Sequence, residues 1–202
     1  MRSKEENMNE KGFHGTCMKY FEDIQSEGLD PLKCKHRNDH WLGQGVYFFD
    51  DYDKALWWAS NISEKNKKCG AIIFKAKIIV PDNKVLNLDN RKQLDMFIDS
   101  SIEMLKEIEK RCKGKMPIFV KKNFRAFFFD YYKQQHDIAV IVKTFHKDYA
   151  GYTKKRNYTE KKMQQEIMEI TGLSFFERQI CVSQKDYIKE LKLVYNEKEE
   201  VI

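Results

Sequence analysis

Residues 42–49 read LGQGVYFF, in which two glycines one position apart lead into an apolar and aromatic run. A Gly-x-Gly directly before an aromatic strand lets a flat surface of another molecule come close to the backbone. The stretch therefore predicts a strand at 46–49. Asp50 or Asp51 is then expected to cap a helix, because the apolar residues that follow recur at helical spacing: Ala55, Leu56, Trp58, Ala59 and Ile62.

A second chemical signal precedes this one at residues 13–16, which read FHGT. A strand that ends in His-Gly and is followed at once by a helix exposes an imidazole and backbone groups together. We expect a short strand end at 13–15, with Thr16 as the N-cap of the helix. Gly28 is expected to follow the last helical turn and to end that helix.

The rest of the chain alternates strands and helices without a regular βαβ period or an internal repeat. Strands are expected at 71–80, 85–88, 138–142 and 179–182, long helices at 94–112 and 120–132, and a segment of either type at 186–195. This mixture predicts a single α+β domain covering residues 1–202.

Taken together and in this order, the motifs resemble the catalytic domain of ADP-ribosyltransferases, most closely the diphtheria-toxin and poly(ADP-ribose) polymerase branch with its His, Tyr and Glu motifs. That branch has His-Gly-Ser/Thr on its first strand, a helix ending at Gly-Leu, and a Gly-x-Gly-x-Tyr-Phe strand. A second aromatic residue follows eleven positions after the Tyr. Here these positions are taken by 14–16, 28–29, 43–48 and Trp58. The resemblance is sharp over 13–60, weaker at 71–88 and 177–182, and absent from 91–170.

The resemblance implies an ADP-ribosyltransferase-like split β-sheet core at about 11–90 and 137–195, with a helical basic insertion at about 91–136. It also implies that NAD is the ADP-ribose donor, held in a crevice between two small sheets. His14 would hydrogen-bond the adenosine ribose, and the Gly15 backbone would hold the nicotinamide carboxamide. Tyr47 and Trp58 would enclose the nicotinamide ring, since aromatic faces suit a flat, cationic pyridinium. The implied donor-binding set is His14, Gly15, Thr16, Gly45, Tyr47 and Trp58.

The third motif departs from the family pattern. The family's catalytic Glu heads a strand, and the counterpart here is 176–182, FERQICV, with Gln179 in the Glu position. Gln can hydrogen-bond a ribose hydroxyl, but it cannot stabilise a cationic transition state by charge or act as a base. Glu177 lies two residues earlier and so points to the same face of a strand. Toxin-type relatives use a Gln/Glu-x-Glu pair at this spacing in the opposite order. The catalytic candidates are Glu177, Gln179, Tyr47 and His14, and the choice between Glu177 and Gln179 stays open.

The distribution of charge bears on the acceptor. Between Lys110 and Lys162 the chain has 15 Lys and Arg against 4 Asp and Glu, interleaved with 11 aromatic residues. This composition is typical of single-stranded nucleic-acid binding, and core aromatics beside a solvated basic face would also produce it. We expect mono-ADP-ribosyl transfer to a macromolecule, with nucleic acid weakly favoured over protein, because a third motif without the ordinary Glu resembles non-polymerising members.

No apolar run approaches the roughly 18 residues of a bilayer span, and no apolar segment marks the N-terminus for export. A cytoplasmic protein without membrane partners is therefore expected. By analogy with the family, it would be an intracellular toxin or phage-defence effector with a neutralising antitoxin as partner. The alternatives are an RNA 2′-phosphotransferase-like enzyme and a non-catalytic NAD- or ADP-ribose-binding module. Cys34, His36 and His40 lack an evident fourth zinc ligand, so no metal is expected.

Overall fold

The computed structural model describes residues 6–37, 40–112, 125–147, 158–171 and 175–198. Its strands are β1 (Asn7–Cys17), β2 (Val46–Phe49), β3 (Ala71–Pro81), β4 (Val85–Asn87), β5 (Val140–Lys147), β6 (Phe175–Val182) and β7 (Ile188–Asn196). Its helices are α1 (Phe21–Glu27), α2 (Tyr52–Lys65), α3 (Arg91–Arg111), α4 (Arg125–His136) and α5 (Tyr158–Thr171). The strands form one seven-stranded sheet in the order β4-β5-β6-β2-β1-β3-β7, which confirms the predicted α+β class.

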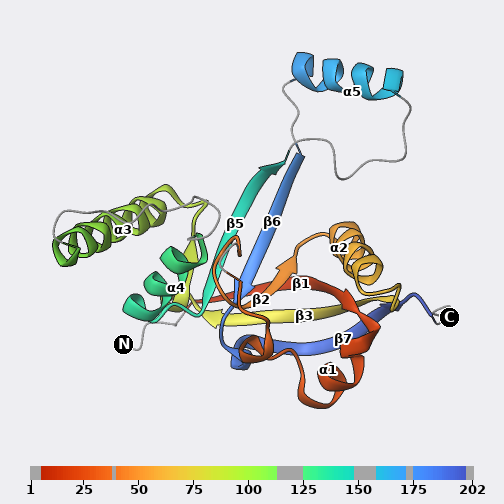
Figure 1. The fold of residues 1–202 in the computed structure, drawn as a ribbon, viewed down its shortest axis with the longest axis horizontal. Coiled ribbons are helices and arrows are strands. Elements are labelled where there is room, and N and C mark those ends of the chain that lie inside the picture. The colour runs from red at the N-terminus through yellow and green to blue at the C-terminus, as the bar shows by residue number, and fades with distance from the viewer. Residues whose placement is uncertain (1–5, 38–39, 113–124, 148–157, 172–174, 199–202) are drawn as a thin grey trace.

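The sheet is divided between β1 and β2. Their register contains the single pair Phe13↔Phe49, whereas β1 pairs with β3 along its whole length. The strands β5 and β6 run steeply across the direction of β1, β3 and β7 (Figure 1). We refer to β4, β5, β6 and β2 as the hairpin lobe and to β1, β3 and β7 as the β1 lobe. Beyond Phe13, the edge of β1 that faces β2 carries no strand ladder within the described residues.

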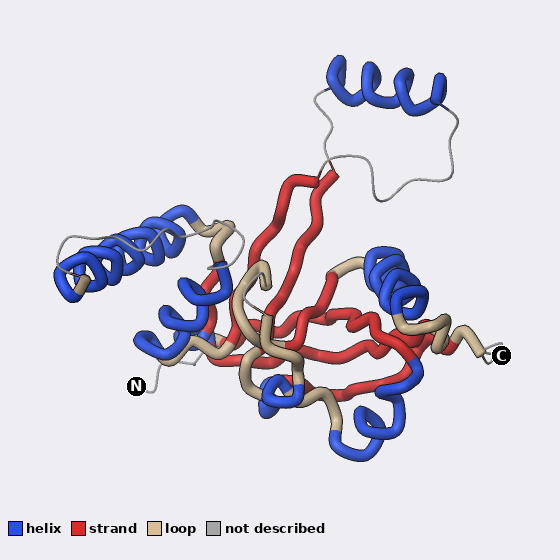
Figure 2. Tube along the Cα trace, in the orientation of Figure 1, coloured by secondary structure: helices blue, strands red, loops and turns tan. Residues whose placement is uncertain are grey.

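The helices α1 to α4 pack against the strands of the sheet, whereas α5 stands away from it (Figure 2). Ala55 and Ala59 of α2 pack with Ile73 of β3, and Ile24 of α1 belongs to the apolar cluster that contains Phe74. The helices α3 and α4 cover the hairpin lobe through an apolar cluster that contains Leu42, Leu86, Leu88, Phe97, Phe129, Tyr132, Ile141 and Cys181. This arrangement leaves the junction between β1 and β2 bordered by α2 from one lobe and by the 42–45 loop from the other.

The helix boundaries follow local chemistry where the sequence predicts them. The Asp51 carboxylate accepts a hydrogen bond of 2.8 Å from the amide of Asp53, so Asp51 caps α2 as expected. Gly28 ends α1 with a φ of 75°, which also confirms its predicted place. Thr16 is not a helix cap: β1 continues through Cys17 because Thr16 pairs with Ile72 of β3.

Other expectations are extended, resolved or missed. The segment at 186–195 becomes strand β7 by pairing with β3, and the strand expected at 138–142 runs on to Lys147. The helix α5 was not expected from the sequence. The predicted helix start at 120–124 lies outside the described residues. Among the helices that the structure describes, none is long and apolar enough to cross a membrane.

Candidate functional site

The first two motifs meet at the junction of the lobes. The Nδ1 atom of His14 on β1 lies 2.9 Å from the carbonyl oxygen of Tyr47 on β2. Because a carbonyl oxygen can only accept, Nδ1 is the donor, and Nε2 of the neutral ring is left as an acceptor. Burial lowers the pKa of His14, and the hydrogen bond to Tyr47 offsets part of that effect. His14 is therefore a neutral imidazole at pH 7 with an acceptor nitrogen available for a hydroxyl.

The Tyr47 side chain is fixed by the loop before its own strand. Its hydroxyl donates to the carbonyl oxygen of Gly43 at 2.7 Å and accepts from the amide of Leu42 at 2.7 Å. Its ring contacts His40, with centroids 5.5 Å apart. Burial raises the pKa of the Tyr47 phenol, so this hydroxyl stays protonated at neutral pH. The position of the ring thus depends on the path of residues 42–45.

The third motif places its two polar residues side by side on β6. Gln179 pairs with Phe49 of β2, and Tyr47 pairs with Cys181, so the register puts Tyr47, Gln179 and Glu177 on one face of the hairpin lobe. Glu177 is 2% exposed and Gln179 is 7% exposed. The Nε2 atom of Gln179 donates a hydrogen bond to Oε1 of Glu177. The Oε1 atom of Gln179 is buried and receives no hydrogen bond within the described part of the chain.

The glycines and Thr16 serve close packing. A Cβ atom on Gly15 would lie 2.1 Å from the carbonyl oxygen of Ala55, so only glycine lets α2 approach β1 this closely. A Cβ atom on Gly45 would lie 2.7 Å from the sulfur of Cys181. Thr16 is 6% exposed within β1. Gly15 thus lets α2 approach β1, and Gly45 lets the 42–45 loop approach β6, each within its own lobe.

Trp58 lies on the solvent side of α2 and is 39% exposed. Its ring contacts that of Trp57, with centroids 6.4 Å apart. One helical turn earlier, the Nζ atom of Lys54 donates to the carbonyl oxygen of Phe176, the residue before Glu177. The structure therefore ties the start of α2 to the third motif, while the Trp58 ring itself is available to a molecule from solvent.

Two residues that the sequence analysis did not single out hold the Gly43–Gly45 loop. The Oδ1 atom of Asp130 on α4 accepts from the Gln44 amide at 2.7 Å, and the Nζ atom of Lys133 donates to the Gln44 carbonyl oxygen at 2.7 Å. Lys133 is only 8% exposed. A sequence signal existed, because Lys133 lies four residues after Phe129 and seven after Ala126 on the apolar face of its helix.

Asp89, just after β4, organises the far edge of the hairpin lobe. Its carboxylate accepts from Nζ of Lys143 at 2.9 Å and from Oγ1 of Thr144 at 2.7 Å. It also lies 3.5 Å from the guanidinium of Arg178, whose other nitrogens bond Glu10 of β1. Burial would raise the pKa of Asp89, but the hydrogen bonds from Lys143 and Thr144 outweigh it and lower that pKa. The network links the two lobes beyond the end of β2.

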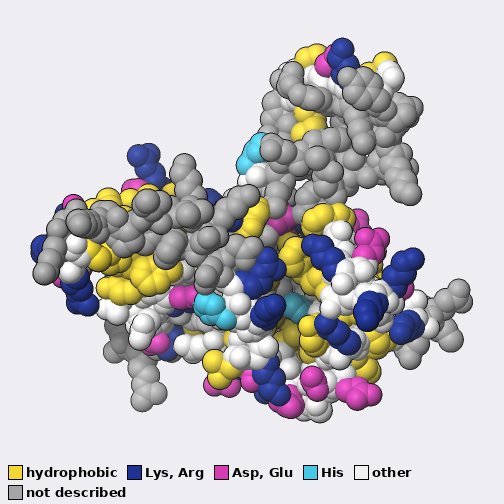
Figure 3. All heavy atoms as spheres, viewed as in Figure 1, with side chains coloured by type: hydrophobic (Ala, Val, Ile, Leu, Met, Phe, Trp, Pro, Cys, Tyr) yellow, Lys and Arg dark blue, Asp and Glu magenta, His cyan; other side chains and the backbone are white. Residues whose placement is uncertain are grey.

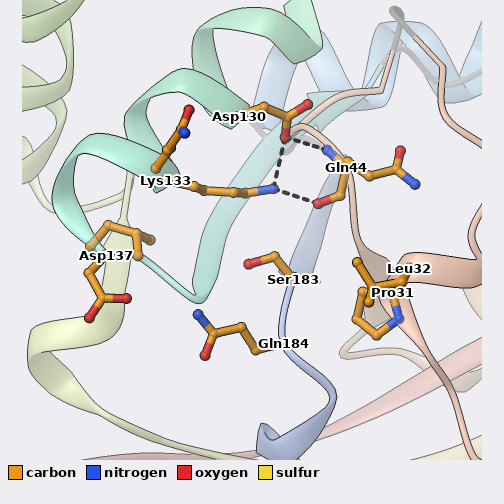
Figure 4. A pocket seen from close by; sticks show the side chains of 10 residues that line it. Pro31, Leu32, Gln44, Asp130, Lys133, Asp137, Ser183 and Gln184 are labelled. Carbon is orange, nitrogen blue, oxygen red and sulfur yellow. Dashed lines mark hydrogen bonds and ion pairs between the residues drawn. The ribbon is translucent and has the colours of Figure 1, made fainter.

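Two cavities lie away from the predicted site residues. One has a volume of about 370 Å³ and lies between α4, the 3₁₀ turn at Pro31–Lys33 and the end of β6 (Figure 4). The other, of about 350 Å³, lies between α1 and β7. Neither is lined by His14, Tyr47, Glu177 or Gln179.

The face of the molecule drawn in Figure 3 has charges of both signs, because Lys and Arg share it with Asp and Glu. Much of the basic window at 110–162 lies outside the described residues. Large apolar side chains are exposed on α3 and α5: Met96, Ile98, Ile102, Met163, Ile167 and Ile170.

Searches for similar proteins add no assignment. No protein-family model matches the chain, and no curated protein matches it. Within the described ranges, His, Cys, Asp and Glu form no group of three or more that could hold a metal ion. The five cysteines are free thiols. A function for this protein is therefore inferred from the positions of His14, Tyr47, Glu177 and Gln179.

Proposed function

We propose that this protein is an NAD-dependent mono-ADP-ribosyltransferase that modifies a macromolecular acceptor, nucleic acid or protein. The supporting observation is the contact of the first two motifs at the junction of the lobes, with the third motif on the strand that pairs with β2. His14 bonds the backbone of Tyr47, and Tyr47 shares a sheet face with Gln179 and Glu177. Residues 13–16, 46–49 and 177–179 lie far apart in the sequence, so only the fold unites them.

Transfer of ADP-ribose from NAD⁺ requires a carboxylate, a group that binds the ribose, and side chains that bind the departing nicotinamide ring. The bond between the ribose C1′ and the nicotinamide nitrogen breaks, and its electron pair stays on that nitrogen. C1′ then bonds to a nucleophilic atom of the acceptor, whose proton passes to a base. The transition state resembles an oxocarbenium ion, so a nearby carboxylate stabilises it.

Glu177 is the group that supplies charge, and Gln179 is the group that binds the ribose. A buried amide oxygen without a donor costs about 1–3 kcal/mol, and a ribose hydroxyl would satisfy the Oε1 atom of Gln179. The hydrogen bond from Gln179 to Glu177 keeps the carboxylate aimed along the same face of β6. Since Glu177 is 2% exposed, the side chains that cover it must shift when a substrate enters.

His14 and the tyrosine motif serve the two ends of the donor. The Nε2 atom of His14 is an acceptor for an adenosine ribose hydroxyl, because Nδ1 is committed to Tyr47. Tyr47 and Trp58 would hold the nicotinamide between aromatic faces, which suits a cationic ring. The 39% exposed Trp58 is the member of this pair that can move onto a bound ring.

The test is release of nicotinamide from NAD⁺ by the purified protein, alone, with RNA, with DNA and with cell lysate. Release that requires an added macromolecule supports a transferase and identifies the class of acceptor. We expect Glu177→Gln to lower kcat by about 10²–10⁴-fold, the usual contribution of a positioned acid or base. Gln179→Ala should chiefly raise KM for NAD⁺.

The control is Glu190→Gln on β7, where an exposed glutamate forms an ion pair with Lys77. This variant removes the same charge far from the third motif and should leave release unchanged. NAD⁺ binding without release in every mixture would overturn the enzyme assignment in favour of a binding module. Absence of binding, with His14→Ala and Tyr47→Ala indistinguishable from wild type, would overturn the NAD site itself.

A further inference from the structure

The Tyr47 hydroxyl is held by the backbone of Leu42 and Gly43, and α4 hydrogen-bonds the backbone of the next residue, Gln44. The Gln44 amide donates to Asp130, and the Gln44 carbonyl oxygen accepts from Lys133. Both bonds are drawn in Figure 4, where the Lys133 side chain reaches from α4 across to the backbone of Gln44. The backbone amide and the backbone carbonyl of Gln44 are thus both hydrogen-bonded by side chains of α4.

The residue before Gln44 must be glycine for α4 to make these contacts. Gly43 has a φ of 80°, and a Cβ atom there would lie 2.4 Å from Oδ1 of Asp130 and 2.9 Å from Nζ of Lys133. The first glycine of the Gly-x-Gly pair therefore makes room for the two charged side chains of α4. Its carbonyl oxygen, in turn, accepts the hydrogen bond from Tyr47.

Lys133 is buried, and its ammonium group contacts three groups. Its ammonium group is 3.4 Å from Asp130 and 3.6 Å from the sulfur of Cys181, besides its bond to Gln44. A lysine is almost never fully buried unless its charge is paired, so the pairing with Asp130 explains how it is tolerated. The pairing does not require the Gln44 contacts, which both side chains make in addition.

We propose that Asp130 and Lys133 are positioning residues for the donor site, which set the place of Tyr47 through the backbone of Gln44. The inference rests on the proposed function, because it assigns Tyr47 to the nicotinamide ring. It also gives a role to α4, which carries no family motif but supplies the two side chains that bind Gln44. The route runs from α4 to Gln44, to the Gly43 carbonyl, and to the Tyr47 hydroxyl.

The experiment measures amide hydrogen exchange in the full-length protein. The amide of Leu42 donates to the Tyr47 hydroxyl, so its exchange rate reports the place of Tyr47 without any substrate. We expect Lys133→Met to speed exchange at both Gln44 and Leu42 by about fivefold or more, the effect of losing one hydrogen bond. Tyr47→Phe, which deletes the Leu42 partner, provides the reference rate.

Two further variants separate positioning from general loosening. Asp130→Ala should speed exchange at Gln44, and Asp130→Asn should restore it, because Asn keeps an acceptor oxygen for the Gln44 amide. Lys110→Met removes an exposed ion pair with Glu107 on α3 and should change neither rate. Faster exchange at Gln44 with Leu42 unchanged would overturn the proposal, since α4 would then hold the loop without placing Tyr47.

The kinetic arm uses nicotinamide release. Since ring stacking binds the ground state and the transition state alike, Lys133→Met should raise KM for NAD⁺ by about tenfold and leave kcat within about threefold. An unchanged KM overturns the positioning role. If the wild type releases no nicotinamide under any condition, the proposed function fails, and the exchange rates alone decide whether α4 places Tyr47.

Discussion

Replacing Gly15 by alanine tests the contact that joins α2 to the first motif. The φ of Gly15 is outside the left-handed region, so its backbone would accept an alanine. A Gly-to-Ala change at such a position normally stabilises a protein by about 0.4–1 kcal/mol through the unfolded chain. The obstacle is space alone, because the new Cβ atom would lie 2.1 Å from the Ala55 carbonyl oxygen and 3.2 Å from Cβ of Ala59.

The magnitude follows from which atoms must move. Real Cβ atoms essentially never come within 3.0 Å of another heavy atom, so Ala55 has to retreat. The obstructing atom is backbone within α2, so the helix must shift by about 1 Å as a body in a close-packed interior. Overpacking of this kind costs about 1–3 kcal/mol, and lost contacts at the helix add to it. We expect Gly15→Ala to lower the free energy of unfolding by about 2–4 kcal/mol.

Urea unfolding followed by tryptophan fluorescence measures this loss. The midpoint should fall while the slope m is unchanged, and the melting temperature should fall by roughly 5–15 °C. Gly12→Ala is the comparison, because its new Cβ atom would lie 2.7 Å from Cβ of Phe48, a smaller overlap than the 2.1 Å approach at Gly15. It should lose less stability than Gly15→Ala. A Gly15→Ala protein as stable as wild type would refute the close packing of α2 on β1.

Two pH effects follow from the shifted groups. Burial lowers the pKa of His14, so below about pH 6.5 the unfolded chain takes up a proton that the folded chain refuses, and stability falls as pH decreases. His14→Gln should therefore flatten the decline in melting temperature between pH 7 and 5; parallel curves would contradict this. The lowered pKa of Asp89 stabilises the fold above about pH 3.9, and this contribution is lost on further acidification. Asp89→Asn should melt lower at pH 7 with a weaker acid dependence, and equal curves would show that Lys143 and Thr144 add nothing.

Much of the fold can be predicted from periodicity and capping. The pattern of α2, its Asp51 cap and the Gly28 stop appear in the structure as expected, because each depends on neighbours a few residues away. Whether Thr16 caps a helix or lies in a strand could not be predicted from its sequence neighbours. It has the chemistry of a cap, but pairing with Ile72, 56 positions away in the sequence, keeps it in a strand. The type of the segment at 186–195 likewise depends on β3.

Some residues of the candidate site could likewise be predicted from the sequence, and others could not. The resemblance predicted that His14 and Tyr47 belong to one site, and a hydrogen bond joins the His14 ring to the backbone carbonyl of Tyr47. The side-by-side placement of Gln179 and Glu177 followed from strand alternation. Asp130 and Lys133 could not be assigned, since their partner is a backbone rather than a side chain and no motif records it.

The division of the sheet into two lobes also affects the order in which the chain can fold. The chain passes between the lobes several times: β1 and β3 belong to one lobe, β2, β4, β5 and β6 to the other, and β7 returns to the first. Neither lobe is a continuous stretch of sequence, so most pairings close long loops, which slows folding. Because β3 pairs with β7, which follows the other described strands in the sequence, the β1 lobe is completed only after β7 has been synthesised. The two lobes that hold His14 and Tyr47 are therefore both complete only after β6 and β7 have emerged.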